Sequence, residues 1–475
     1  MQSNCIKETS KACFNTCCVN PLLGLPSPPK PGTTTTAADP RRDFITAILS
    51  SIQPNSNFTN HESLPTSTEL LSCLNNAFPH YSNTILADNI RAHEYNHLSN
   101  HVCLDYTGTG LFSYSQLNPT AEITSSSPFF DISYKLVNLN DSYGIQDSEF
   151  EATMKRRIMR YMNLIEEDYS MIFTANQSSA FKLLADSYPF NSKQNILTVY
   201  DHENEPVQEM IKVAKHKGAR PLSALFSWPN FRVNSRKLRK IVLNKNKKRN
   251  NKGLFVFPLQ SRITGSRYSY QWMNLARENG WHVLLDASSL GAKDMETLGL
   301  SLFLPDFLIC SFYKIFGENP SGFCCLFIKK SIFSVLSKPT TGIGIISLIP
   351  EKGPSQNSTF HEIGQNPVRL KKKEPLFTEI EELEENHEKI ECRGLDHADA
   401  LGLILISSRA RCLINWLVNA LSTLKHPHSG NGLPLVRTYG PKIKLDRGPA
   451  LAFNLYDWKG FSRREGNSVG KKERL

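Results

Sequence analysis

Two short, largely apolar segments lie close together in the sequence, and each leads to a charged side chain. Residues 281–285 (WHVLL) lead to Asp286, and residues 307–310 (FLIC) lead to Ser311 and Lys314. Apolar runs of this length, bounded by turn residues, are typical of strands buried on both faces of a parallel sheet. The segments therefore predict an α/β fold with Asp286 and Lys314 at the ends of nearby strands.

A lysine at the end of a buried strand has particular chemistry available to it. Desolvation lowers the pKa of a buried ammonium group, and a partly neutral amine can form a Schiff base with an aldehyde cofactor. A strand-end carboxylate such as Asp286 can keep a pyridinium nitrogen protonated, as pyridoxal phosphate enzymes require. Taken alone, Lys314 could simply extend into solvent, and a strand-end Asp is common in parallel sheets. Only the two residues together indicate pyridoxal phosphate.

A polar stretch, residues 174–179 (TANQSS), follows the predicted strand 169–173 and precedes the predicted helix 180–187. Small hydroxyl and amide side chains at such a turn leave backbone N–H groups free at the helix N-terminus, where the helix dipole also favours an anion. The pattern fits a phosphate site, and it fits an ordinary N-cap equally well.

The segments LFVFPLQSRITGSRYSYQWM, HVLLDASS and SFYKIFGENPSGFCCLFIKK occur in this order. Their order and spacing resemble the aminotransferase-like domain of eukaryotic molybdenum cofactor sulfurases, and more closely the shorter plant proteins related to them. The resemblance extends from about residue 91 to about residue 460. It implies a fold-type-I pyridoxal phosphate transferase of the class that includes cysteine desulfurases. Such a protein is a homodimer whose large domain has a mostly parallel sheet and whose small C-terminal domain is α+β.

The resemblance also implies roles for individual residues. Lys314 would be the Schiff-base residue and Asp286 the partner of the pyridinium nitrogen, and these two are the expected catalytic residues. Gln177 and Ser178 would hold the cofactor phosphate through main-chain and hydroxyl donors. Ser311, in the same segment as Lys314, is a further expected cofactor contact. The expected site contains no metal.

The chain departs from the family pattern at two positions. The histidine that stacks on the pyridine ring falls on or near Asn204, with His202 slightly earlier, so either residue could cover the ring. Arg262 stands where the family has an Asn that touches the phenolic oxygen of the cofactor. An arginine there could contact the same oxygen and favour the phenolate, or it could bind a substrate carboxylate.

The C-terminal part lacks two features of the family. We find neither a Gly-Cys-x-Cys-like loop that would supply the sulfur-accepting thiolate nor the molybdenum-cofactor-binding module, and the small domain therefore looks incomplete. Two functions are compatible with this pattern. The first is sulfur transfer from an amino acid, with cysteine as the candidate substrate; the alternative is a weak or inactive relative that acts as a scaffold or binding module. Cys392, on a polar stretch, is the remaining candidate nucleophile.

Composition restricts the other possibilities. With 475 residues and 40% hydrophobic content the chain can form more than one domain, and no apolar run is long enough to span a bilayer. The 11 cysteines match no disulfide framework or zinc spacing, which favours a reducing compartment. We expect a cytoplasmic protein, with a plastid as the alternative. The net charge of +11 comes mainly from residues 236–252, whose lack of interleaved aromatics disfavours nucleic-acid binding.

These observations divide the chain into five predicted regions. They are a disordered Cys/Pro-rich leader (1–42), a helical N-terminal extension (43–100), the pyridoxal phosphate-binding large domain (101–345) with a solvated basic insertion (236–252), a polar and acidic linker (346–390), and the small C-terminal domain (391–475).

Overall fold

The structure is a computed structural model that describes residues 66–100, 114, 130–135, 148–243, 252–289, 300, 302–312, 323–337, 344–350, 392–424, 433–441 and 447–456. At its centre is a seven-stranded sheet in the order β2-β10-β9-β8-β7-β3-β4. The strands are β2 (Tyr169–Thr174), β3 (Asn195–Thr198), β4 (Arg220–Ser223), β7 (Gly253–Pro258), β8 (Trp281–Asp286), β9 (Phe307–Ser311) and β10 (Cys324–Lys329). Only β10 runs antiparallel to its neighbours, so the sheet is mostly parallel, as predicted.

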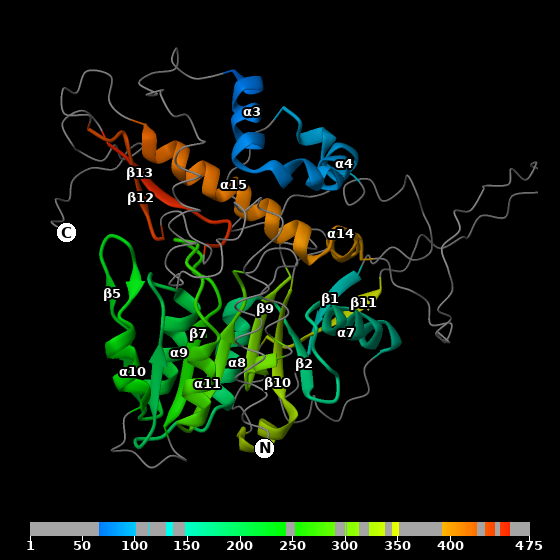
Figure 1. Cartoon of the computed structure of the whole chain (residues 1–475). Helices are drawn as coiled ribbons and strands as arrows, with labels where there is room; N and C mark the ends of the chain where they lie inside the picture. Colours follow the sequence, from blue (N-terminus) through cyan, green and yellow to red (C-terminus); the bar gives the residue numbers. More distant parts are fainter. Residues whose placement is uncertain are drawn as a thin grey trace, which may run out of the picture.

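The central strands are buried on both faces because helices cover each side (Figure 1). Along β7, Phe255 and Phe257 belong to one apolar cluster and Leu254 and Val256 to the other, as the alternation of side chains along a strand requires. Removing one such side chain from water stabilises the fold by about 1.5–3 kcal/mol. This is why the apolar runs of the sequence occupy the middle of the sheet.

Helices α8 (Gln177–Ser187) and α9 (Glu205–His216) pack on one face of the sheet, and α7 (Glu149–Tyr161), α10 (Ser235–Leu243) and α11 (Gln271–Glu278) pack on the other. Residues 236–252 were expected to form a solvated insertion, but residues 235–243 form α10, which buries Leu238 and Val242 in the core. Ile241 is partly buried and packs against the same core. Because so few apolar residues stand among many charged ones, the helical pattern in the sequence is weak. Residues 244–251 lie outside the described residues.

A second layer lies above the carboxyl ends of the parallel strands (Figure 1). The long helix α15 (Leu403–Thr423) runs across it after α14 (Arg393–Leu401), and the hairpin of β12 (Val436–Tyr439) and β13 (Ala452–Leu455) completes the small C-terminal domain. The N-terminal helices α3 (Ser67–Ala77) and α4 (Ile85–Glu94) pack on α15. Leu74 and Phe78 contact Cys412 and Val418, and Arg409 pairs with Asp88 at 2.5 Å.

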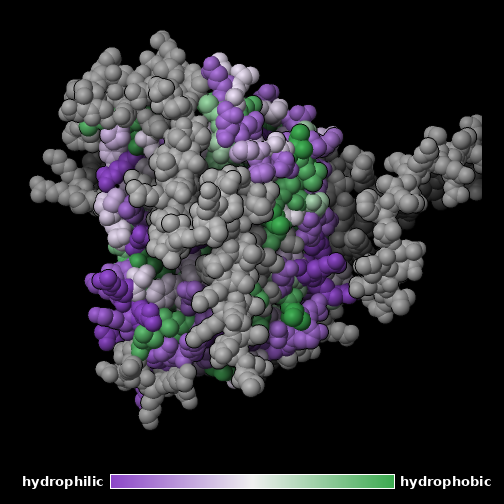
Figure 2. Space-filling model, in the orientation of Figure 1, coloured by the Kyte–Doolittle hydropathy of each residue, from purple (hydrophilic) through white to green (hydrophobic). Residues whose placement is uncertain are grey.

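The remaining described elements are short. They are two small sheets, β1 (Phe130–Tyr134) with β11 (Ile346–Pro350) and β5 (Phe226–Ser227) with β6 (Arg232–Val233), and the 3₁₀ helices η4 (Pro79–Thr84), η5 (Asn96–Leu98) and η8 (Lys330–Val335). On the face shown in Figure 2, the described surface is largely hydrophilic and its apolar side chains form small groups. No single helix among the described residues is long and apolar enough to cross a membrane, although the pair Leu395–Leu401 and Leu403–Ser422, bent by 86°, meets the length and composition requirement when joined.

Candidate active site

Asp286 ends β8 at the carboxyl edge of the sheet, and its side chain is enclosed by hydrogen-bond donors. The Ser288 N–H and hydroxyl donate to Oδ1 at 3.0 and 2.6 Å, and the Tyr200 hydroxyl donates to Oδ2 at 2.9 Å. The Gln177 amide lies 3.5 and 3.4 Å from the two oxygens. Asp286 is only 4% exposed, and burial raises its pKa above the ordinary value although these donors oppose the shift.

The donors come from three separate elements of the sheet edge. Gln177 is the first residue of α8, Tyr200 follows β3, and Ser288 follows β8. All three donate as neutral groups, so they stabilise the Asp286 carboxylate without cancelling its charge. Burial, and then the nearby charge of Asp286, keep the pKa of Tyr200 well above its ordinary value. Tyr200 therefore acts as a donor throughout the physiological pH range.

The predicted phosphate turn lies beside this carboxylate. Asn176 is the N-cap of α8 and accepts the Ser179 N–H at 2.9 Å. Helix geometry leaves the N–H groups of Gln177 and Ser178 without an intrahelical acceptor, and Ser178 is exposed. Gly344 packs against this turn at φ +101°, where an added Cβ would lie 2.8 Å from the Ser179 Cβ. The N-cap and an open anion position are thus both present at one helix terminus.

The first family departure is partly explained by the geometry. Asn204 is the N-cap of α9, and its side-chain oxygen accepts the Val207 N–H at 3.4 Å. His202 instead points its Nδ1 at the Asp201 carboxylate, 2.8 Å away, and its ring centroid lies 6.4 Å from that of Tyr200. His202 therefore stands beside the Tyr200–Asp286 pair, whereas Asn204 serves the helix.

The other predicted site residues are placed less completely. Ser311 ends β9 at the same edge of the sheet and is half-buried, and β9 pairs with β8 so that Ile309 is opposite Asp286. Arg262 is exposed on the turn after β7. Lys314 lies outside the described residues. The structure thus brings Asp286, Gln177 and His202 together, and the expected roles of all the predicted site residues stay predictions.

Sequence reasoning missed a second buried carboxylate, Asp201. It accepts hydrogen bonds from Ser261 Oγ at 2.9 Å, Thr264 Oγ1 at 2.6 Å and His202 Nδ1. Burial would raise the pKa of Asp201, but these hydrogen bonds outweigh it and hold the pKa below the ordinary value. Tyr268 lies near enough for the charge of Asp201 to add to burial in raising its pKa. The available signal was the position of Tyr200 and Asp201 at the end of a predicted strand parallel to β8.

The described cysteines near the sheet are poor nucleophiles. Cys310, Cys324 and Cys325 are buried in β9 and β10, and burial raises the pKa of each thiol. Cys392, expected on a polar stretch, is only 1% exposed and lies with its Sγ 3.9 Å from the Met154 sulfur. Among the cysteines that the structure describes near this site, none is both accessible and activated.

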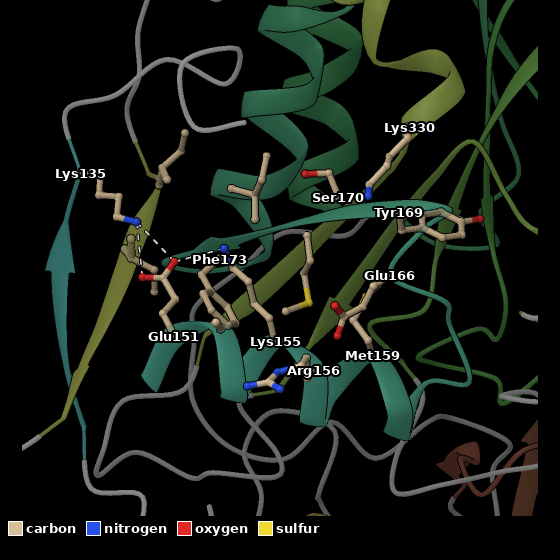
Figure 3. Close-up of a pocket in the computed structure, with 15 residues that line it drawn as sticks. Lys135, Glu151, Lys155, Arg156, Met159, Glu166, Tyr169, Ser170, Phe173 and Lys330 are labelled. Carbon is tan, nitrogen blue, oxygen red and sulfur yellow. Dashed lines mark hydrogen bonds and ion pairs between the residues drawn. The ribbon is translucent and has the colours of Figure 1, made fainter. Parts of the chain in front are cut away.

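A pocket of about 490 Å³ opens elsewhere, beside the outer edge of β2 (Figure 3). Lys135, Glu151 and Lys155 line it, and both lysines pair with Glu151 at 3.3 Å. Strands β10 and β9 separate β2 from β8, so this pocket is not part of the Asp286 site. In the described residues, no group of three or more His, Cys, Asp or Glu side chains is arranged to hold a metal ion.

Comparison with known proteins agrees with the predicted resemblance. No protein-family model matches the sequence. The human molybdenum cofactor sulfurase is 27% identical over 416 residues, covering 78% of this chain and 41% of that protein. The bovine sulfurase is 25% identical over 393 residues (78% and 41%), and that of Oryza sativa subsp. japonica is 23% identical over 422 residues (81% and 47%). The chain therefore spans less than half the length of these curated relatives.

Among solved structures, the apo cysteine desulfurase from Thermococcus onnurineus NA1 matches with a TM-score of 0.50 at 16% identity, covering 78% of this chain and 82% of that one. The match confirms the predicted fold-type-I architecture, and the curated relatives confirm the predicted similarity to molybdenum cofactor sulfurases. The narrower resemblance to shorter plant proteins stays a prediction.

Proposed function

We propose that this chain binds pyridoxal phosphate and transfers sulfur from an amino acid, with cysteine as the candidate donor. The observation that carries the proposal is the buried Asp286 carboxylate, which is held by neutral donors beside an open helix N-terminus. A buried anion of this kind is well suited to a cationic partner, such as a protonated pyridine nitrogen. The similarity to sulfurases supports the same assignment.

The described residues fit the cofactor. Asp286 would hold the pyridine nitrogen, while the N–H groups of Gln177 and Ser178 and the Ser178 hydroxyl would hold the phosphate. Lys314 would attach the aldehyde carbon, and Ser311 would contact the cofactor from the end of β9. When bound, pyridoxal phosphate supplies an electron sink that stabilises negative charge on the α-carbon of an amino acid.

His202 and Arg262 would act on the substrate side. Because His202 uses Nδ1 to donate to Asp201, the Nε2 of the neutral ring remains able to accept a proton. We assign His202, rather than Asn204, to cover the cofactor ring, since the Asn204 side chain caps α9. The exposed guanidinium of Arg262 would bind the carboxylate of the incoming amino acid, which its bidentate geometry suits. The alternative role for Arg262 is direct contact with the phenolic oxygen of the cofactor.

A catalytically inactive scaffold is the alternative, and the intact arrangement around Asp286 favours the transferase. Among the described residues, Asp286 is hydrogen-bonded only by neutral groups, and a buried carboxylate of this kind reduces stability unless a cation binds to it. The similarity to curated sulfurases supports the same choice. We further propose a homodimer and a cytoplasmic location; light scattering of the purified protein and imaging of a tagged chain would test them.

The test is cofactor uptake by the purified full chain. Pyridoxal phosphate attached to Lys314 should give an absorption band near roughly 400 nm that is lost in Lys314→Ala. The band should be kept in Lys330→Ala, a control at an exposed lysine that begins η8. A protein that stays colourless at saturating cofactor would refute the proposal.

The transfer step needs a separate assay. Sulfide or alanine release from cysteine, with and without a reductant, should depend on Lys314 and Asp286. We expect slow turnover of free cysteine by this chain alone, because a thiolate must reach the substrate sulfur and the described cysteines near the site are buried. Cys392→Ser should leave the rate unchanged because the Cys392 thiol is buried. Loss of activity in Cys392→Ser would instead identify the Cys392 thiol as the sulfur acceptor and contradict its description as a buried, inactive thiol.

A further inference from the structure

Asp201 lies between the candidate site around Asp286 and the turn formed by residues 261–266. It lies between Tyr200, which donates to Asp286, and His202, and its side chain is only 1% exposed. Its two oxygens accept three hydrogen bonds, two from hydroxyls on the turn after β7 and one from His202. A carboxylate is acceptor-only, so it can serve all three donors at once.

The turn that Asp201 holds, residues 261–266, is organised by the same hydroxyls. The Ser261 oxygen accepts the N–H groups of Ile263 and Thr264 at 3.3 and 3.0 Å, while its own proton goes to Asp201. Thr264 also lies 2.9 Å from Ser266 through the hydroxyl oxygens. Asp201 therefore supports the shape of the turn through two side chains that are 60 and 63 residues away in the sequence.

The small C-terminal domain rests on this turn. The Gly448 N–H donates to the Gly265 carbonyl at 2.7 Å, and Ser266 forms a β-bridge with Arg447. Gly440, at the end of β12, approaches so closely that an added Cβ would lie 2.7 Å from the Thr264 Cβ. The same Cβ would lie 2.9 Å from the Thr264 carbonyl oxygen, so the backbone at Gly440 packs directly on Thr264.

A second contact joins the small C-terminal domain to the large domain independently of Asp201. Trp228, in the hairpin of β5 and β6, has its ring centroid 5.2 Å from that of Tyr439 on β12. Trp228 is largely exposed and has no contact with the Asp201 cluster among the interactions of the described residues. It therefore offers a matched control for loosened docking.

We propose that Asp201 is a positioning residue that couples the docking of the C-terminal domain to the orientation of His202 and the Tyr200–Asp286 pair. One side of Asp201 holds the turn on which Gly440 and Gly448 rest, and the other fixes the histidine beside the site. Its role in the reaction rests on the proposed function, whereas the coupling itself is a property of the cofactor-free chain.

The test compares Asp201→Asn with Trp228→Ala in the cofactor-free full chain. Asparagine has one acceptor oxygen, so at least one of the three hydrogen bonds must be lost. We expect hydrogen exchange of β12 and β13 to accelerate about tenfold in both variants, while β7 and β8 stay protected. The nitrogen chemical shifts of His202, which report its tautomer, should change most in Asp201→Asn. They should change to a smaller extent in Trp228→Ala, because coupling between docking and His202 acts in both directions.

Unchanged exchange of β12 and β13 in Asp201→Asn, or unchanged His202 shifts, would overturn the proposal. If Asp201→Asn does not fold, Thr264→Val removes a single donor and should accelerate the same exchange to a smaller extent. Asp186→Asn, at the far end of α8, should change neither readout. Because no cofactor is present, failure of pyridoxal phosphate binding would refute the proposed function without altering these results.

Discussion

Asp286 and Glu151 are both buried carboxylates, 4% and 2% exposed, yet their surroundings differ in charge. Two lysines meet Glu151 at 3.3 Å, Lys135 from beyond β1 and Lys155 from the next turn of α7 (Figure 3). The side chains bonded to Asp286 within the described structure are all neutral. Glu151 is therefore compensated by two lysines of the chain, whereas the described side chains bonded to Asp286 leave its charge uncompensated.

This difference in charge is what we expect between a structural carboxylate and one that binds a cationic group, which is the role we propose for Asp286. A buried ion pair strongly resists removal of one partner because the other charge is left behind. A buried carboxylate supported by neutral donors reduces stability on its own and becomes useful when a cation binds. Burial alone would have made the two sites look equivalent.

The largest effect that tests the difference between Asp286 and Glu151 is expected when the Asp286 carboxylate is removed. Asp286→Ala should weaken pyridoxal phosphate binding at least about 100-fold, because the pyridinium would be buried without its counter-charge. Glu151→Gln should leave the affinity unchanged, since two strands separate it from the site. Spectroscopic titration with the cofactor measures both, and equal losses would show that the two carboxylates do not have distinct roles.

The free energy of unfolding should depend more on Glu151 than on Asp286, the reverse of the order expected for cofactor affinity. Glu151→Gln leaves Lys135 and Lys155 without their anion and should lower the free energy of unfolding by about 2 kcal/mol, less than for a fully buried pair because both lysines retain some exposure. The exposed Glu166, which lines the same pocket, provides the control Glu166→Gln. Urea unfolding measures the difference, and an equal effect of the two substitutions would argue against the ion-pair account.

The pH dependence of stability sharpens the comparison further. Because the pKa of Asp286 is raised in the folded chain, the native state binds more protons than the unfolded state between the ordinary and the raised value. The cofactor-free chain should therefore lose stability as pH rises through this window. Asp286→Asn should remove this pH-dependent loss of stability, because asparagine does not titrate. Parallel unfolding curves of the two proteins at every pH would contradict the assignment.

The smallest effect is expected at Arg262. Its side chain is exposed, so Arg262→Ala should change the free energy of unfolding by less than about 0.5 kcal/mol. If Arg262 binds the substrate carboxylate, KM for the amino acid should rise while cofactor affinity stays the same. A change in the pH titration of the bound cofactor, without a change in KM, would favour contact with the phenolic oxygen instead.

The apolar runs alone predicted the central strands and the carboxyl-edge position of Asp286, because burial on both faces of a parallel sheet leaves a simple hydrophobic pattern. The same reasoning placed α8 after β2 and the polar turn at its start. It failed for α10, where two buried apolar residues among many charges give too weak a periodicity.

Tertiary structure alone decided which polar side chains meet. The Tyr200–Asp286 hydrogen bond depends on β3, β7 and β8 lying side by side in register, and the Asp201–Thr264 bond joins residues that no local pattern connects. The sequence likewise left Asn204 and His202 as alternatives, and only the tertiary structure showed the cap of α9 and the Asp201 contact that support our assignment of His202. The physical reason is that hydrophobic periodicity reports which face of an element is buried, whereas hydrogen bonds between distant segments depend on how those elements are assembled.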